Sequence, residues 1–227
     1  MPETPIFPDC NEQQARWPIV IGVGSALVGI VLLVWRNALV GDFHFDDYGS
    51  IVENRAVRSL WPLADFAKAG RPFGLYTFAL NYHFSQLDPS AYRLTNLLIH
   101  VANVLLLFAG VHLTGRIMRQ RFEPTTSAGF GGLLLVATIA LIWGLHPLTT
   151  QAVTNIVQRY ESLAAMEYLG AWVGMLLVMG GGRKIGLILV LVFSWVGLLS
   201  KEIFATAPLS PCSMASSDRS KLSESSA

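Results

Sequence analysis

The chain has 227 residues, of which 52% are hydrophobic and only 14% are charged, and its mean hydropathy is +0.48. A soluble domain usually carries about 25% charged residues, so this composition argues against an ordinary soluble globule. The formal net charge of +1 gives no basic excess that would indicate nucleic-acid binding, and the two cysteines, Cys10 and Cys212, exclude a disulfide framework and a cysteine-rich zinc site.

The hydrophobic residues gather in five segments that approach or reach the roughly 20 apolar residues a helix needs to cross a bilayer. The predicted segments are 17–35, 94–113, 128–145, 163–179 and 185–200. The first is too long for the hydrophobic part of a cleaved signal peptide and has no small-residue cleavage site after it, so we expect a signal anchor. The predicted fold class is an all-α polytopic membrane protein, with a membrane domain over 17–208.

Basic residues in the short loops predict the orientation, because such loops tend to stay in the cytoplasm. Loop 114–127 carries three arginines and the turn 180–184 carries two basic residues, whereas the connection 146–162 carries one. We therefore expect the N-terminal residues 1–16 in the cytoplasm, and the long loop 36–93 and the 146–162 connection on the outer face.

Two stretches between the membrane segments have helical spacing. Phe73, Tyr76, Leu80 and Phe84 are spaced 3, 4 and 4, which predicts an amphipathic helix too short to span. It fits equally a helix lying in the membrane interface and a core helix of a small external domain. After His146-Pro147, polar residues recur at helical spacing over 151–163 and apolar residues form the opposite face. We therefore expect this connection to be helical too.

Polar residues inside the membrane segments can have either a structural or a functional role. Asn96, His100 and Asn103 share one face of the second segment, where they would either form interhelical hydrogen bonds or line an outward-facing cavity. Glu167 lies inside the fourth segment, where a carboxylate is costly unless it is paired, and a proton-relay or transport role stays open. Gly170-x-x-x-Gly174 predicts close packing of two helices.

The strongest chemical candidates lie in the outer loops. Asp46 and Asp47 follow the first membrane helix among aromatic residues, and a carboxylate there can act as a general base toward a hydroxyl. The alternative is a pair of solvated or helix-capping acids. Arg71 and Arg159 can bind a phosphate in bidentate fashion. His44-x-Asp46 by itself defines no metal site.

The final residues, 209–227, include eight serines and lack hydrophobic periodicity. This composition predicts a disordered tail. The abrupt change after Pro208 is also what a reading-frame change would produce.

Five motifs, in this order along the chain, resemble one family. They are FHFDDYGSIVENRAV, RPFGLYTFALNY, DPSAYRLTNLLIHVANVLL, LIWGLHPLTTQAVTNIVQRYESLAA and LLSKEIFATAPL. Together they resemble the membrane portion of bacterial relatives of the transmembrane and tetratricopeptide-repeat O-mannosyltransferases, which belong to the GT-C class of glycosyltransferases. The resemblance covers about residues 30–208.

The resemblance implies a GT-C-like helix bundle that transfers a sugar, mannose in the family, from a polyprenyl-phosphate donor to a hydroxyl, such as that of an exported protein. The protein would lie in the bacterial inner membrane and act on its outer face. The family's acidic pair falls on Asp46 and Asp47, which would be catalytic. Its donor-phosphate or substrate-binding positions fall on Arg71, Asn96, His100, His146, Arg159, Glu161, Lys201 and Glu202. No metal site is implied, although the use of a divalent cation stays open.

Two departures from the family pattern favour other functions. Gln151 stands where the family often has an acidic residue, and the family continues with further membrane helices and a tetratricopeptide array, so we expect a truncated enzyme. A non-catalytic membrane scaffold or assembly partner is the second hypothesis. A small transporter, suggested by Glu167 and the polar stripe on the second segment, is the third.

Overall fold

A computed structural model describes residues 10–62, 66, 70–122 and 130–200, with side chains from Trp17 onward. Within these ranges the chain is helical and has no strand. The longer helices are α1 (Cys10–Trp35), α3 (Pro72–Ser85), α4 (Pro89–Phe122), α5 (Phe130–Gly144), α7 (Arg159–Met179) and α8 (Arg183–Ser200). Short helical turns are η1 (Arg36–Leu39), η2 (Tyr48–Val52), η3 (Arg55–Arg58), η4 (Pro147–Thr149) and α6 (Thr150–Thr154).

The helices confirm the predicted fold class, an all-α polytopic membrane protein. Four helical segments, Trp17–Leu39, α4, α7 and α8, are long and apolar enough to cross a membrane. A fifth span exists if α5 is counted with the η4–α6 segment after it, which is bent by 52° relative to α5. The division of the chain into an N-terminal segment, a membrane domain and a tail stays a prediction.

The bend after α5 follows from the His146-Pro147 dipeptide. Proline has no N–H to continue the helix, and its ring disfavours helical backbone at the residue before it. His146 accordingly takes an extended conformation, with φ −64° and ψ 136°. Its side chain accepts a hydrogen bond from the backbone N–H of Leu148, which starts the next helical turn (3.2 Å).

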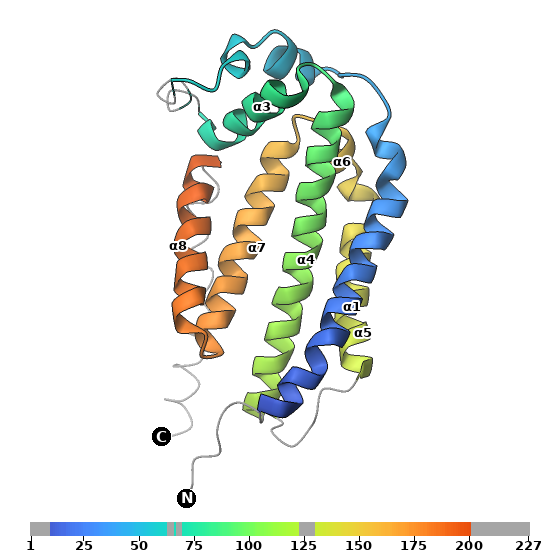
Figure 1. The fold of residues 1–227 in the computed structure, drawn as a ribbon, viewed down its shortest axis with the longest axis vertical. Helices are drawn as coiled ribbons and strands as arrows, with labels where there is room; N and C mark the ends of the chain where they lie inside the picture. The colour runs from blue at the N-terminus through green and yellow to red at the C-terminus, as the bar shows by residue number, and fades with distance from the viewer. Residues whose placement is uncertain (1–9, 63–65, 67–69, 123–129, 201–227) are drawn as a thin grey trace, which may run out of the picture.

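The long helices run alongside one another, and α3 lies across one end of them (Figure 1). Residues 40–62 lie at this same end, whereas α1 begins at the opposite end. We call residues 36–62, residues 71–85 (α3 with Arg71 before it) and residues 145–159 the cap. The cap has its own apolar core, separate from the core that α1, α4 and α5 share, and its members include Phe43, Ile51, Val57, Leu75, Phe78, Tyr92 and Ile156.

Helix α3 confirms the predicted helix but not its predicted buried face. The buried residues are Gly74, Leu75, Phe78 and Ala79, whereas Phe84 of the predicted apolar face is 82% exposed. Helix α3 contacts η3, α4, α7 and α8, which cover it from several directions. A helix in such surroundings does not bury a single regular stripe.

Helices α7 and α8 form a closely packed hairpin, as the glycine motif predicted. A Cβ atom on Gly174 would lie 2.9 Å from the Val190 backbone nitrogen and 3.0 Å from the Gly186 carbonyl oxygen. A side chain on Gly170 would meet the ring of Phe193. The turn between the two helices passes through Gly181, whose φ of +94° is in the region that favours glycine.

Candidate functional site

The acidic pair is split between two environments. Asp46 is exposed, whereas Asp47 is 1% exposed. The carboxylate of Asp47 accepts backbone hydrogen bonds from His44 through Oδ2 and from Val157 through Oδ1, both at 3.0 Å. Asp47 therefore ties the loop after α1 to the segment before α7, and Asp46 is the member of the pair that can meet a substrate.

Residues 155–158, between α6 and α7, are not part of a helix, although the sequence pattern predicted a helical connection. Helix α6 ends at Thr154, and its C-cap residue Asn155 is extended, with a ψ of 117°. The backbone groups freed by the break are bound by side chains from elsewhere in the chain. Asn96 Nδ2 donates to the carbonyls of Asn155 (3.1 Å) and Ile156 (3.2 Å), and Asp47 accepts from Val157. These long-range bonds satisfy backbone groups that burial would otherwise leave unpaired.

Arg159 is the centre of the cap and is fully buried. Its Nε donates to Asn96 Oδ1 (2.7 Å), its Nη2 to the Tyr92 carbonyl (2.9 Å) and its Nη1 to the Thr77 carbonyl (3.2 Å). The guanidinium carbon lies 4.4 Å from the centroid of the Phe78 ring. One side chain thus links α3, α4 and α7, and its donors are directed at protein acceptors rather than at open space.

The polar stripe on α4 forms interhelical hydrogen bonds. Asn96, His100 and Asn103 are each at most 1% exposed. His100 Nε2 donates to the Gly144 carbonyl at the end of α5 (2.8 Å), and Asn103 Nδ2 donates to the Ser162 carbonyl on α7 (2.9 Å). The Gly144 carbonyl also accepts from Trp35 Nε1 (3.0 Å), which brings α1 into the same contact.

Sequence reasoning missed Arg93, which extends this stripe by one turn. The spacing of 3 between Arg93 and Asn96 is the signal that could have found it. Arg93 is 3% exposed, and its Nη2 donates to the Asp42 carbonyl (2.6 Å). A Cβ atom on Gly41 would overlap the Arg93 guanidinium, so this contact requires glycine there, and Gly41 also has a φ of +133°. Arg93 therefore holds the start of the loop that carries the acidic pair.

The other predicted site residues differ in how exposed they are. Arg71 is half-buried at the start of α3, and its guanidinium carbon lies 5.3 Å from the centroid of the Tyr160 ring. His146 and Glu161 are exposed, as is Gln151. Lys201 and Glu202 lie outside the described residues. Among the described residues, no group of three or more His, Cys, Asp or Glu side chains is arranged to hold a metal ion.

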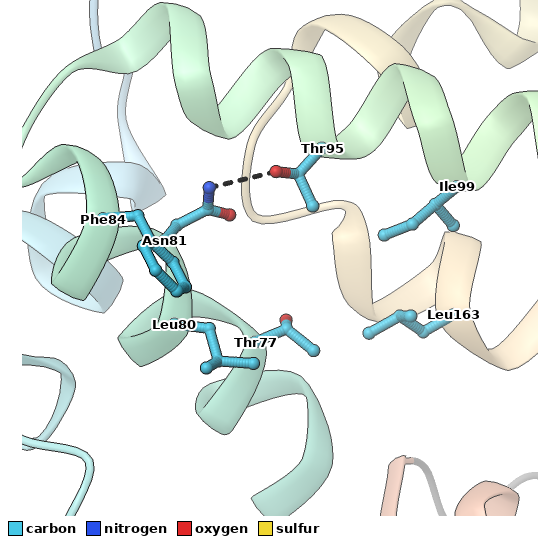
Figure 2. Close-up of a pocket in the computed structure, with 7 residues that line it drawn as sticks. All are labelled: Thr77, Leu80, Asn81, Phe84, Thr95, Ile99 and Leu163. Atoms are coloured by element: carbon cyan, nitrogen blue, oxygen red, sulfur yellow. Dashed lines mark hydrogen bonds between the residues drawn. The ribbon is translucent and has the colours of Figure 1, made fainter.

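A cavity of about 350 Å³ lies beneath α3, between α3, α4 and α7 (Figure 2). Its lining residues are Thr77, Leu80, Asn81, Phe84, Thr95, Ile99 and Leu163. Asn81 Nδ2 donates to Thr95 Oγ1 (3.0 Å), while Asn81 Oδ1 is buried without a partner in the described part of the chain. The cavity is otherwise mostly apolar and shares Thr77 with the Arg159 network.

Glu167 is fully buried on α7, where its Oε1 accepts from Ser200 Oγ at 2.5 Å. Its other oxygen, Oε2, has no hydrogen-bond partner among the described residues. Glu167 is outside the cap, and none of its described contacts joins it to the acidic pair.

The fold and the cap define a polytopic membrane protein with polar chemistry gathered at one end, and comparisons with known proteins show its relatives. The chain is 31% identical over 172 residues to protein O-mannosyl-transferase TMTC4 of Mus musculus, a match that covers 65% of this chain and 22% of that protein. It is 29% identical over 164 residues to protein O-mannosyl-transferase TMTC3 of Homo sapiens, covering 65% of this chain and 16% of that protein.

A third relative matches more of the chain. Protein O-mannosyl-transferase F38B6.6 of Caenorhabditis elegans is 27% identical over 201 residues, which covers 82% of this chain and 27% of that protein. No known family profile and no solved structure matches the chain. The chain is thus a distant homologue of membrane protein O-mannosyl-transferases over most of its length, and it spans about a sixth to a quarter of the length of these relatives.

Proposed function

We propose that the chain is the membrane portion of a GT-C-type glycosyltransferase that moves mannose from a polyprenyl-phosphate donor to a protein hydroxyl. The homology to protein O-mannosyl-transferases carries this proposal. The acidic pair, Arg71 and His146 all belong to cap segments, at one end of the long helices, which supports it. The orientation derived from the basic loops puts the cap on the outer face of the membrane and the N-terminus in the cytoplasm.

Asp46 is the general base in this proposal because it is the exposed carboxylate of the pair. Its carboxylate takes the proton of the attacking hydroxyl while that oxygen bonds to the anomeric carbon of mannose. The bond from the anomeric carbon to the phosphate oxygen breaks, the configuration inverts, and polyprenyl phosphate leaves. Asp47 acts as a positioning residue, because both of its oxygens are occupied by backbone N–H groups.

Of the two arginines that the sequence singled out, Arg71 is the one that stabilises the departing phosphate in this proposal. Its guanidinium packs on Tyr160 at a partly exposed position, whereas the donors of Arg159 are occupied inside the cap. A planar guanidinium can bind two phosphate oxygens at once. His146 and Glu161 are the further exposed candidates for substrate contact. Asn96 and Arg159 support the site by holding the cap to the helices, and His100 joins α4 to the end of α5.

The test is transfer of labelled mannose from a mannosyl-phosphate polyprenol to a peptide containing serine and threonine, with the chain in lipid nanodiscs. We expect Asp46→Asn to lower the rate by about 10²- to 10⁴-fold, the usual contribution of a general base. Glu53→Gln is the matched control, because Glu53 is another exposed carboxylate of the same loop. Transfer by Asp46→Asn at the wild-type rate would contradict the assignment of the base. Absence of transfer by the wild-type chain would contradict activity of the chain on its own.

A further inference from the structure

Phe45 combines a strained backbone with an exposed aromatic ring. Its φ is +42°, in the left-handed region that residues with a side chain rarely adopt and that Gly, Asn and Asp tolerate best. Its side chain is 93% exposed, so packing of the ring does not compensate for the strain. Residues held in such conformations cluster at functional sites, where the surrounding structure maintains them.

Hydrogen bonds on both sides of Phe45 hold this conformation. The backbone N–H of Asp47 donates to the His44 carbonyl (2.9 Å), and that of Tyr48 donates to the Phe45 carbonyl (3.2 Å). The Asp47 carboxylate closes the turn through the His44 N–H and anchors it to Val157. The fold therefore holds the backbone of Phe45 in this conformation while its ring stays exposed.

The neighbouring aromatic residue shows that the exposure of Phe45 is not a general property of this loop. Phe43, two residues earlier, is 9% exposed and packs edge-to-face on Tyr92 with a centroid distance of 5.7 Å. Phe43 thus supplies the hydrophobic contact of the loop. Phe45 adds no burial to the cap core, although a glycine or asparagine would fit its backbone with less strain.

The immediate surroundings of Phe45 favour a sugar over a lipid chain. Asp46 and His44 on either side are exposed, and Tyr48 is 49% exposed. A carboxylate and an imidazole beside the ring would be costly to insert into hydrocarbon. An aromatic face next to hydrogen-bonding groups instead matches a pyranose ring, which has an apolar C–H face and hydroxyl groups around its edge.

We propose that Phe45 binds the sugar of the donor, with its ring held outward as a platform for the C–H face of the hexose beside Asp46. This inference rests on the proposed function and names the residue that would recognise the sugar rather than the lipid phosphate. Tyr48, two residues after Asp46, provides a second, partly exposed aromatic surface. Phe45 is a binding residue in this scheme, and Asp46 remains the base.

The test compares the binding of two lipids to the chain in nanodiscs without an acceptor, so that no transfer occurs. The probes are a mannosyl-phosphate polyprenol and the same polyprenyl phosphate without its sugar. We expect Phe45→Gly and Phe45→Asn to weaken binding of the mannosyl lipid about 5-fold, the scale of one aromatic contact, and to leave binding of the sugar-free lipid unchanged. Their thermal unfolding midpoints should equal or exceed that of the wild type, because the strain is relieved.

Two further variants sharpen the test. Phe45→Trp keeps an aromatic face and should retain binding of the mannosyl lipid. Trp61→Ala removes another exposed aromatic side chain of the cap, which is 71% exposed, and should leave binding of both lipids unchanged.

The outcomes separate this inference from the proposed function. Wild-type binding of both lipids by Phe45→Gly, or an equal loss for both lipids, overturns the inference alone, since the ring would then not touch the sugar. A lower unfolding midpoint for Phe45→Asn also overturns it, because the ring would then stabilise the fold. A wild-type chain that binds neither lipid overturns the proposed function, and the inference with it.

Discussion

The cap and the α7–α8 hairpin each bury an ionisable side chain, and they do so in different ways. Arg159 in the cap donates to acceptors on residues 63, 67 and 82 positions away and lies against the Phe78 ring. Glu167 in the hairpin accepts one hydrogen bond, from Ser200, and its second oxygen has no partner in the described part of the chain. The first charge is surrounded by complementary groups, and the second is only half satisfied.

This difference indicates where each region obtains its stability. The cap is an assembly of short elements with little regular structure, so its polar network must connect segments that are far apart in the sequence. The hairpin consists of two regular helices whose backbones already meet at Gly174 and Gly186. We therefore expect polar substitutions to have large effects in the cap, and substitutions that change side-chain volume to have large effects in the hairpin.

The largest expected effect is that of Arg159→Met. The substitution keeps an apolar stem but leaves the carbonyls of Thr77 and Tyr92 and Oδ1 of Asn96 without their donors inside the cap. Each buried acceptor left without a donor costs about 1–3 kcal/mol, and this substitution leaves several. The measurement is the free energy of unfolding in detergent micelles. Arg183→Met is the control, because Arg183 is exposed at the start of α8. Equal stability of the two variants would mean that Arg159 does not hold the cap together.

Gly174→Leu should give the next largest effect. Its side chain would collide with the backbone of α8 near Val190 and Gly186, so the two helices would have to separate. Overpacking of this kind costs about 1–3 kcal/mol. The same unfolding measurement applies, with Gly22→Leu as the control, because Gly22 is exposed and a Cβ atom there would meet nothing within 4 Å. If both leucine variants proved equally stable, the close packing of the hairpin would not limit its stability.

The helices could be predicted from the sequence, because the requirement for about 20 apolar residues is local and strong. The glycine motif was equally informative, since small residues four positions apart define one face of a single helix. The α3 segment marks the limit of such reasoning. Its helical spacing was correct, but its buried face is set by η3, α4, α7 and α8, which the local pattern does not contain.

The candidate site was only partly predictable for the same physical reason. The motif order brought Asp46, Asp47 and Arg159 to attention, but their separate environments depend on contacts across the chain. Asp47 is buried where it accepts a hydrogen bond from Val157, which is 110 positions away in the sequence. The break at residues 155–158 was missed because Asn96 and Asp47 replace the helical partners of that backbone. The strain at Phe45 has no sequence signal, since a phenylalanine would normally argue against a left-handed conformation.

Glu167→Gln should have the smallest effect of the series. The amide keeps an oxygen that can accept from Ser200, and it removes a charge whose second oxygen has no described donor. Replacing an incompletely satisfied buried charge with a neutral group of the same shape is often neutral or stabilising, so we expect a change within about 1 kcal/mol. The measurement is again unfolding in detergent, with Ser200→Ala as the matched variant that removes the donor instead of the charge.

The Glu167→Gln variant also tests whether Glu167 has a structural role or a role in ion transport. If the carboxylate only fills a position between α7 and α8, Glu167→Gln should leave ion flux in proteoliposomes unchanged at the background level. Flux in the wild type that disappears in Glu167→Gln would favour the transporter hypothesis. A loss of stability as large as that of Arg159→Met would instead show that the carboxylate has a strong partner beyond Ser200, and the contrast between the cap and the hairpin would not hold.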